Sequence, residues 1–203
     1  GPAPLMADIL VLFYSRNGAT ASLARSIATG VDSVDGMSAR LRTVPAVSAN
    51  TEAVDAAVPD SGPPYATGRD LEECAGIIMG SPSHFGNMAA PLKHFIDNTL
   101  GEWLRGTLAG KPCATFASTG SLHGGQETTL LSMAIPLLHH GMIFVGVPYT
   151  EEALSATKSG GTPYGPTHVT WNRDADELSD DEKTLARALG ARVADIARRL
   201  ADP

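Results

Sequence analysis

The sequence predicts an α/β domain built on a doubly wound parallel β-sheet. Short, continuously apolar runs recur along the chain, and segments with apolar residues every three or four positions separate them. Strands that alternate with helices favour a parallel sheet covered on both faces, and right-handed crossovers leave the doubly wound arrangement as the common one. We expect a single domain over residues 7–202, with residues 1–6 as a leader or expression remnant.

The first strand and the first helix have the clearest patterns. Asp8–Tyr14 is short and apolar throughout, which is typical of a strand buried on both faces. In residues 19–31, Leu23, Ile27 and Val31 recur every four positions and so share one stripe of a helix.

A second and a third strand follow, separated by an irregular stretch. Residues 37–44 alternate loosely and stop at Pro45, which indicates a strand end. Residues 45–68 show little periodicity and contain several prolines, so we expect a loop excursion. The third strand, 74–79, precedes a helix at 87–99. Pro91 lies in the first turns of this helix, where a proline is better tolerated than in the interior.

The fourth strand, 112–117, leads into a helix at 127–140 and a fifth strand at 142–147. Gly141 suits the position that follows a helix C-terminus. Pro136 lies inside this helix, and we expect it to kink or shorten the helix.

The last segments are a second excursion over residues 148–172 and a C-terminal helix. Ser179, with Glu182 three residues later, forms a capping box that marks the start of this helix. The helix buries one apolar stripe, made of Leu185, Leu189, Val193, Ile196 and Leu200.

The composition excludes several classes of protein. The chain has 203 residues, of which 43% are hydrophobic and 18% charged, too apolar for a disordered chain. Its net charge of −7 argues against a nucleic-acid partner, and no apolar run is long enough to span a membrane. Cys74 and Cys113 lie in strand-like runs, which favours buried, reduced thiols in a cytoplasmic protein.

The loop after the first strand is a candidate anion site. In open α/β sheets, ligands bind beyond the carboxyl ends of the strands. Ser15–Thr20 places hydroxyls, an amide and a glycine at a helix N-terminus, where the backbone N–H groups favour a phosphate. Ordinary capping by Ser15 or Asn17 explains the loop equally well. The glycine patterns of nucleoside triphosphate and dinucleotide sites are missing, which favours a mononucleotide-sized phosphate ester.

Two further loops lie at the same predicted edge of the sheet. Ser81–Asn87 follows the third strand and Ser118–Gln126 the fourth, and both are polar, glycine-containing and weakly charged. Such loops either form plain strand-to-helix turns or lie against a planar heterocycle and bind its edge through main-chain groups. Together with the phosphate-type loop they favour one joint ligand site.

Five motifs, in order along the chain, resemble those of the WrbA-type NAD(P)H:quinone oxidoreductases, which are flavodoxin-like FMN proteins. The resemblance runs from about residue 7 to residue 200. The motifs are Tyr14–Gly18, Gly80–Met88, Ser118–Gly120 with Gly124–Glu127, His139–Met142 and Gly160–Gly165. The resemblance implies a flavodoxin-like sheet with the strand order 2-1-3-4-5, helices on both faces, and a homotetramer.

The resemblance also assigns roles to residues. Ser15–Thr20 would hold the FMN phosphate and the other two loops would flank the isoalloxazine ring, with His139 close to the ring. The implied cofactor-binding residues are Ser15, Arg16, Asn17, Gly18, Ala19, Thr20, Pro82, Ser83, His84, Phe85, Gly86, Asn87, Ser118, Thr119, Gly120, Ser121, Leu122, His123, Gly124, Gly125 and His139. His139 and Tyr149 are the candidate catalytic residues, Trp103 would contact the substrate, and no metal is expected.

The implied activity is FMN-dependent two-electron reduction of quinones to hydroquinones with NADH or NADPH, in ping-pong through one flavin site. A flavodoxin-type electron carrier and a non-catalytic FMN-binding regulatory protein are the alternatives. The chain departs from the family at His84, where arginine is common, and at Leu122 and His123, which lengthen their loop. No acidic residue at a ribose-binding position decides between NADH and NADPH.

Overall fold

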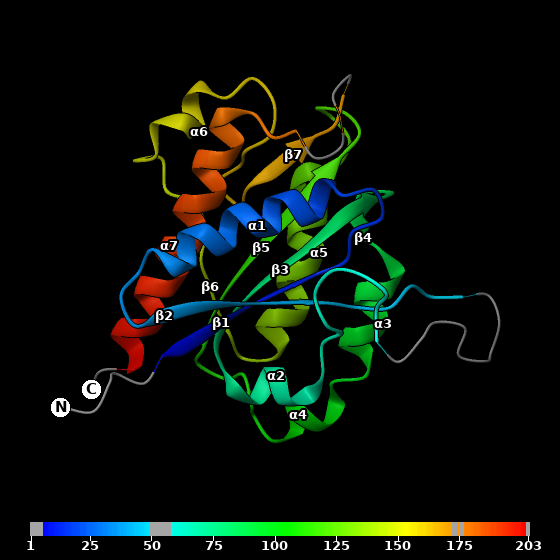
Figure 1. Cartoon of the computed structure of the whole chain (residues 1–203), viewed down its shortest axis with the longest axis vertical. Coiled ribbons are helices and arrows are strands. Elements are labelled where there is room, and N and C mark those ends of the chain that lie inside the picture. Colours follow the sequence, from blue (N-terminus) through cyan, green and yellow to red (C-terminus); the bar gives the residue numbers. More distant parts are fainter. Residues whose placement is uncertain (1–5, 49–57, 172–173, 175–176, 202–203) are drawn as a thin grey trace.

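A computed structural model describes residues 6–48, 58–171, 174 and 177–201. Parts of the expected leader and of both excursions, 45–68 and 148–172, therefore lie outside the described residues, as does residue 202. The remainder forms a parallel sheet with helices on both faces (Figure 1). None of the described helices is long and apolar enough to cross a membrane.

Five parallel strands make up the body of the sheet, in the spatial order β2-β1-β3-β5-β6. Counted along the chain, this is the predicted order 2-1-3-4-5, which is therefore confirmed. The strands are β1 (Ala7–Phe13), β2 (Met37–Thr43), β3 (Cys74–His84), β5 (Pro112–Thr119) and β6 (Ile143–Phe144).

Two short strands were not predicted. β4 (Asn87–Met88) turns back antiparallel on the end of β3, where the expected helix at 87–99 begins with extended backbone. β7 (Thr167–Val169) pairs with the end of β5, on the side where β6 pairs with its beginning. The fifth predicted strand, 142–147, therefore pairs over only two residues, because β7 occupies the rest of that edge (Figure 1).

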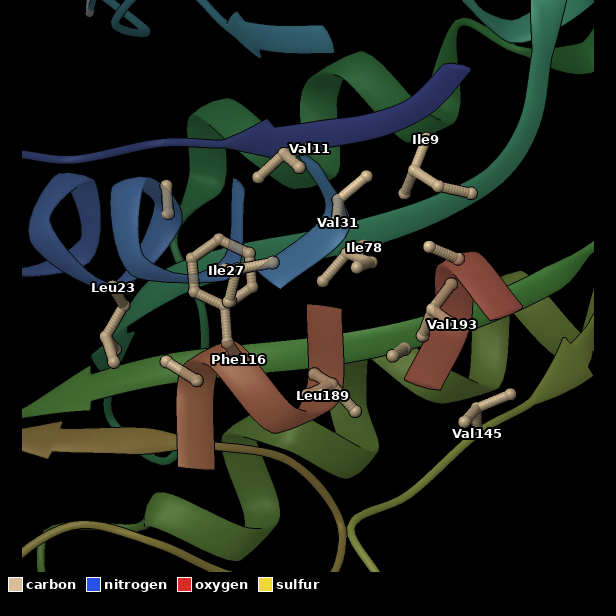
Figure 2. Close-up of a cluster of buried hydrophobic side chains, with 14 of the residues drawn as sticks. Ile9, Val11, Leu23, Ile27, Val31, Ile78, Phe116, Val145, Leu189 and Val193 are labelled. Atoms are coloured by element: carbon tan, nitrogen blue, oxygen red, sulfur yellow. The ribbon is translucent and has the colours of Figure 1, made fainter. Parts of the chain in front are cut away.

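α1 (Ala19–Asp32) and α7 (Asp180–Ala201) cover one face of the sheet, and the predicted stripe of α1 is completely buried there. Figure 2 shows side chains of α1 and α7 packed against Val11, Ile78 and Phe116 of three neighbouring strands. In α7 the first three members of the predicted stripe are buried, whereas Leu200 is exposed because it lies in the last turn.

The other face is covered by α3 (Ala90–Asp97) and α5 (Gln126–His139), with α2 (Gly68–Glu73) at its margin. The short α4 (Leu100–Leu104) follows α3, and α6 (Glu152–Ala156) lies in the second excursion. Neither α2 nor α6 was expected, since both are shorter than the window over which helical periodicity is visible.

Two of the local expectations can be compared directly with the backbone. α5 continues three residues past Pro136, so the proline does not shorten the helix. Gly141 has a positive φ of 78° and its N–H donates to the carbonyl of Leu138, as expected of a residue that follows a helix end.

The two cysteines are buried, as expected, and both are free thiols. Burial raises the pKa of the Cys74 thiol and raises that of Cys113 to about 12, so both thiols are protonated and inert.

Candidate functional site

The loop between β1 and α1 exposes a row of backbone donors. Gly18 is the residue that precedes the first turn of α1, and its φ is 93°. Glycine has no side chain, so Gly18 itself cannot cap the N-terminus of the helix. Ser15 Oγ accepts a hydrogen bond from the N–H of Ala21 at 3.3 Å, so the capping role considered for Ser15 is present. The backbone N–H groups of residues 16–20 meet no acceptor among the described residues, which leaves them available to an anion.

The three predicted loops meet at the carboxyl ends of β1, β3 and β5. They enclose a pocket of about 410 Å³, called the loop pocket below. Its lining residues are Ser15, Arg16, Asn17, Ala19, Thr20, Pro82, Ser83, His84, Ser118, Thr119, Gly120 and Thr170. Of these, only Thr170 was not a candidate. It follows β7, in which Thr167 and Val169 are β-branched, and these two residues were the available signal of a short strand.

The lining of the loop pocket is polar, and no carboxylate is found among the described residues that form it. Thr20 Oγ1 and Ser118 Oγ are hydrogen-bonded at 2.9 Å and join the first helix to the end of β5. Arg16 forms no ion pair with any described residue, so its guanidinium is free to meet a negatively charged ligand. Donors, hydroxyls and one cation without an opposing acid are the groups that a phosphate ester needs.

The second and third loops are locked to each other. Thr129 Oγ1 donates to Ser83 Oγ at 2.8 Å, and Ser83 Oγ donates to the carbonyl of Gly124 at 3.2 Å. Gly86 and Gly125 approach so closely that a Cβ on Gly125 would lie 2.8 Å from Gly86 Cα. These contacts hold the turn after β3 against the N-terminus of α5 and so fix one wall of the site.

Phe85 stands at the tip of this turn in an unusual conformation. It has a φ of 56°, the only positive value at a non-glycine among the described residues, and its side chain is fully exposed. A bulky residue in the left-handed region is uncommon and costs free energy, so the surrounding contacts must impose this conformation. The ring is thereby exposed to solvent directly after His84, which lines the loop pocket.

His139 and Trp103 do not lie in the loop pocket. They line a groove of about 820 Å³ on the outer surface of α3, α4 and α5, called the helical groove below, where Trp103 Nε1 donates to the carbonyl of His139 at 2.8 Å. α5 begins beside the loop pocket and His139 is its last residue, ~20 Å away at 1.5 Å per residue. Within one chain, the structure therefore does not bring these two residues to the predicted flavin site.

The remaining candidates are distributed around the loop pocket. Gly86 and Asn87 line the near end of the helical groove. A third pocket, of about 470 Å³ and called the side pocket below, is lined by Ser121, Leu122, His123, Lys158, Ser159, Val169 and Trp171. Tyr149 is 68% exposed and is not one of the described residues that line these three pockets.

His168 and Glu182 form a completely buried pair that was not predicted from the sequence, which indicated Glu182 only as part of a capping box. Nδ1 of His168 in β7 lies 2.8 Å from Oε2 of Glu182 in α7. Burial alone would raise the pKa of Glu182, but the hydrogen bonds from His168 and from the N–H groups of Ser179 and Gly160 outweigh it and lower the pKa to about 2. The predicted capping box is confirmed, since Glu182 N–H donates to Ser179 Oγ at 3.1 Å.

Residues 8–151 match the family described as NADPH-dependent FMN reductase. The chain belongs to this family. Two curated relatives extend the match over nearly the whole chain, and both are named NAD(P)H dehydrogenase (quinone). The protein from Trichlorobacter lovleyi is 44% identical over 96% of this chain and 99% of its own length. The protein from Solidesulfovibrio magneticus is 40% identical over 95% of this chain and 98% of its own.

Solved structures give the same fold for this FMN reductase family member. A WrbA-like flavodoxin from Agrobacterium tumefaciens superposes with a TM-score of 0.69 at 23% identity, over 95% of this chain and 98% of that one. A flavodoxin from the domain Archaea gives a TM-score of 0.61 at 18% identity, over 94% and 99% of the two chains. At these identities the likeness concerns the fold alone, and it confirms the flavodoxin-like class.

The loop pocket of this family member fits a flavin mononucleotide. The unpaired N–H groups of residues 16–20 and the guanidinium of Arg16 suit its phosphate. The Gly86–Gly125 approach leaves no side chain between the two loops at their closest contact. The carbonyls of Gly124 and Gly125 already accept hydrogen bonds within the chain, which fixes this loop beside the pocket.

Proposed function

We propose that the protein is an FMN-dependent oxidoreductase that reduces quinones to hydroquinones with NADH or NADPH as the electron donor. The observation that carries this proposal is the meeting of three loops in an acid-free pocket at the carboxyl ends of parallel strands. The two relatives named NAD(P)H dehydrogenase (quinone) support it, since they are 40–44% identical over almost the full length.

Each part of the loop pocket has a definite task in this proposal. FMN, when bound, accepts two electrons from the nicotinamide and passes them to the quinone. The N–H groups of residues 16–20 and Arg16 hold the phosphate, and Thr20 and Ser118 fix the position of that loop through their mutual hydrogen bond. The turn at His84–Asn87 and the loop Ser118–Gly125 hold the ring between them and orient it through main-chain groups.

The proposed active site is completed by a second copy of the chain in a homotetramer. His139 lies ~20 Å along α5 from the loop pocket of its own chain, and Trp103 is hydrogen-bonded to its carbonyl, so both reach a flavin only from a neighbouring copy. The helical groove exposes an apolar surface suited to such an interface, formed by Leu100, Trp103, Leu131 and Ile135. In that assembly His139 and Tyr149 are the candidate groups for orienting a quinone.

The proposal also places the protein in the cytoplasm, as a single domain over residues 7–202. Cys74 and Cys113 are free and buried, and unpaired cysteines are typical of a reducing compartment.

The test is a flavin spectrum followed by turnover. The purified protein is loaded with FMN, mixed with NADH or NADPH, and supplied with a benzoquinone. Bleaching of the flavin by the nicotinamide, with fast quinone reduction and parallel double-reciprocal lines, is the expected result. Flavin that neither nicotinamide reduces would indicate an electron carrier. Retained FMN with no transfer to any acceptor would indicate a regulatory protein, and no FMN affinity would overturn the assignment of the loop pocket.

A further inference from the structure

The side pocket adjoins the loop pocket across one pair of backbone groups. Thr119 and Thr170 line the loop pocket, and Thr170 N–H donates to the carbonyl of Thr119 at 3.0 Å. Ser121, two residues after Thr119, and Trp171, directly after Thr170, line the side pocket. The ends of β5 and β7 therefore form a wall shared by both pockets, and a ligand that occupies both pockets must pass over this wall.

The walls of the side pocket suit a planar aromatic ring. The indole of Trp171 is 63% exposed, and Leu122, which also lines the pocket, is 51% exposed. Val169 is only 3% exposed and provides an apolar floor. When a flat ring stacks on an exposed indole, apolar surface of both the ring and the indole is removed from water, so stacking here is favourable.

The polar side chains of the same pocket point to an anion. Lys158 and His123 line it, together with the hydroxyl-bearing residues Ser121 and Ser159, and none of the described residues that line it is acidic. Lys158 forms no ion pair with any described residue, although the chain carries a net charge of −7. A cation without an acid beside an exposed indole is suited to a phosphorylated aromatic base.

We propose that the side pocket binds the adenosine 2′-phosphate end of NADPH, with the adenine on Trp171 and the 2′-phosphate on Lys158. This inference rests on the proposed function, since the nicotinamide end must lie at the flavin in the adjoining loop pocket. Quinones are uncharged and gain nothing from Lys158, whereas NADPH differs from NADH by the one phosphate that this lysine meets. The side pocket is therefore the feature that selects NADPH over NADH.

Binding is tested with adenosine 2′,5′-bisphosphate and adenosine 5′-monophosphate, titrated calorimetrically into the FMN-loaded protein. The bisphosphate is expected to bind about tenfold more tightly, as one charge-assisted contact predicts. Lys158→Ala is expected to abolish that difference. Lys183→Ala, which removes another lysine outside the pocket and changes the net charge equally, is expected to preserve it. Equal affinities in the unsubstituted protein, or no effect of Lys158→Ala, would overturn the proposal.

Two further readouts locate the ligand and separate this inference from the proposed function. The chain has two tryptophans, so in a Trp103→Phe variant quenching by the bisphosphate reports on Trp171 alone, and unchanged emission would contradict the stacking. In turnover, Lys158→Ala should raise the KM for NADPH about tenfold and leave that for NADH unchanged. Equal effects on both donors would overturn the inference while quinone reduction stands. Bisphosphate binding that depends on Lys158, without any quinone reduction, would overturn only the proposed function.

Discussion

Gly18 controls the conformation of the loop that we assign to the phosphate. Its φ of 93° turns the chain into α1, between residues 15–17 and residues 19–20, which line the loop pocket on either side of it. A Cβ at this position would meet no atom within 4 Å, so a larger side chain is opposed by backbone conformation and not by lack of space. The effect of a substitution on the loop can therefore be separated from a packing defect.

We predict that Gly18→Val weakens FMN binding at least about tenfold, because a β-branched residue is strained at positive φ and must rotate the N–H groups away. Gly36→Val is the matched control. Gly36 has a φ of 81° and equally open surroundings, but it lies in the turn before β2. Both variants should lose ~1–3 kcal/mol of unfolding free energy in urea. Only Gly18→Val should lose flavin affinity, measured by quenching of FMN fluorescence.

At the scale of elements, the His168–Glu182 pair joins β7 and α7, which are separated by residues outside the described part of the chain. Oε1 of Glu182 accepts hydrogen bonds from the N–H groups of Gly160 and Val169, at 2.9 and 3.2 Å. One carboxylate therefore ties together the second excursion, the edge strand and the start of the C-terminal helix. β7 pairs with the end of β5, so this carboxylate also supports the strand that carries Ser118 into the loop pocket.

The pair makes stability depend on pH in a predictable direction. The pKa of Glu182 is about 2 in the folded protein, against an ordinary value of 4.5, so folding favours the carboxylate form. Its contribution is complete above about pH 4.5 and is lost as the pH falls from 4.5 toward 2. We predict that Glu182→Gln lowers the unfolding free energy at pH 7 by ~3 kcal/mol, because it leaves His168 without its buried partner.

Urea unfolding at several pH values between 7 and 2 measures the contribution of Glu182 to the unfolding free energy. The difference in unfolding free energy between the unsubstituted protein and Glu182→Gln should shrink as the pH falls through that interval. Glu127→Gln serves as the control, since Glu127 is exposed and forms no ion pair with the described residues. A difference that stays constant down to pH 2 would show that Glu182 acts through packing and not through its charge.

The elements that the sequence predicts well are those whose pattern is local. The stripe of α1 and the capping box of α7 are set by neighbours within one or two turns, so both are visible in the sequence. β6 and β7 are different, because each pairs with β5, a strand that is distant in the sequence. A non-local contact of this kind leaves no pattern in the strand's own sequence. β4 could not be predicted for the same reason, because the turn at Phe85 that precedes it depends on contacts with the loop before α5.

At the scale of the whole molecule, the meeting of the three loops follows from a general rule about parallel sheets, so the sequence alone was enough to predict it. The separation of His139 and Trp103 from those loops could not be predicted from spacing, because it depends on the full length of α5 and on the face to which α4 docks. Thr170 was missed for a related reason, since only the non-local pairing of β7 brings it to the pocket.

The last prediction concerns the helical groove as the proposed interface between copies of the chain. Leu131 lies in the groove and is 42% exposed, whereas Leu200 lies outside it on α7 and is 54% exposed. A glutamate at position 131 would bury an unpaired charge at the interface between copies, so Leu131→Glu should dissociate the tetramer. Leu200→Glu introduces the same charge at a comparably exposed leucine and should leave the tetramer intact. Sedimentation velocity distinguishes the two outcomes.

The same variants test whether a neighbouring copy completes the active site. The loop pocket belongs to one chain, so dissociated Leu131→Glu should retain FMN. It should nevertheless reduce benzoquinone at least about tenfold more slowly, because His139 and Trp103 of the other copy no longer reach the flavin. A dissociated variant with unchanged turnover would show that one chain suffices. A tetramer that survives Leu131→Glu would show that the copies meet on another face, and the apolar surface of α3, α4 and α5 would then need a different partner.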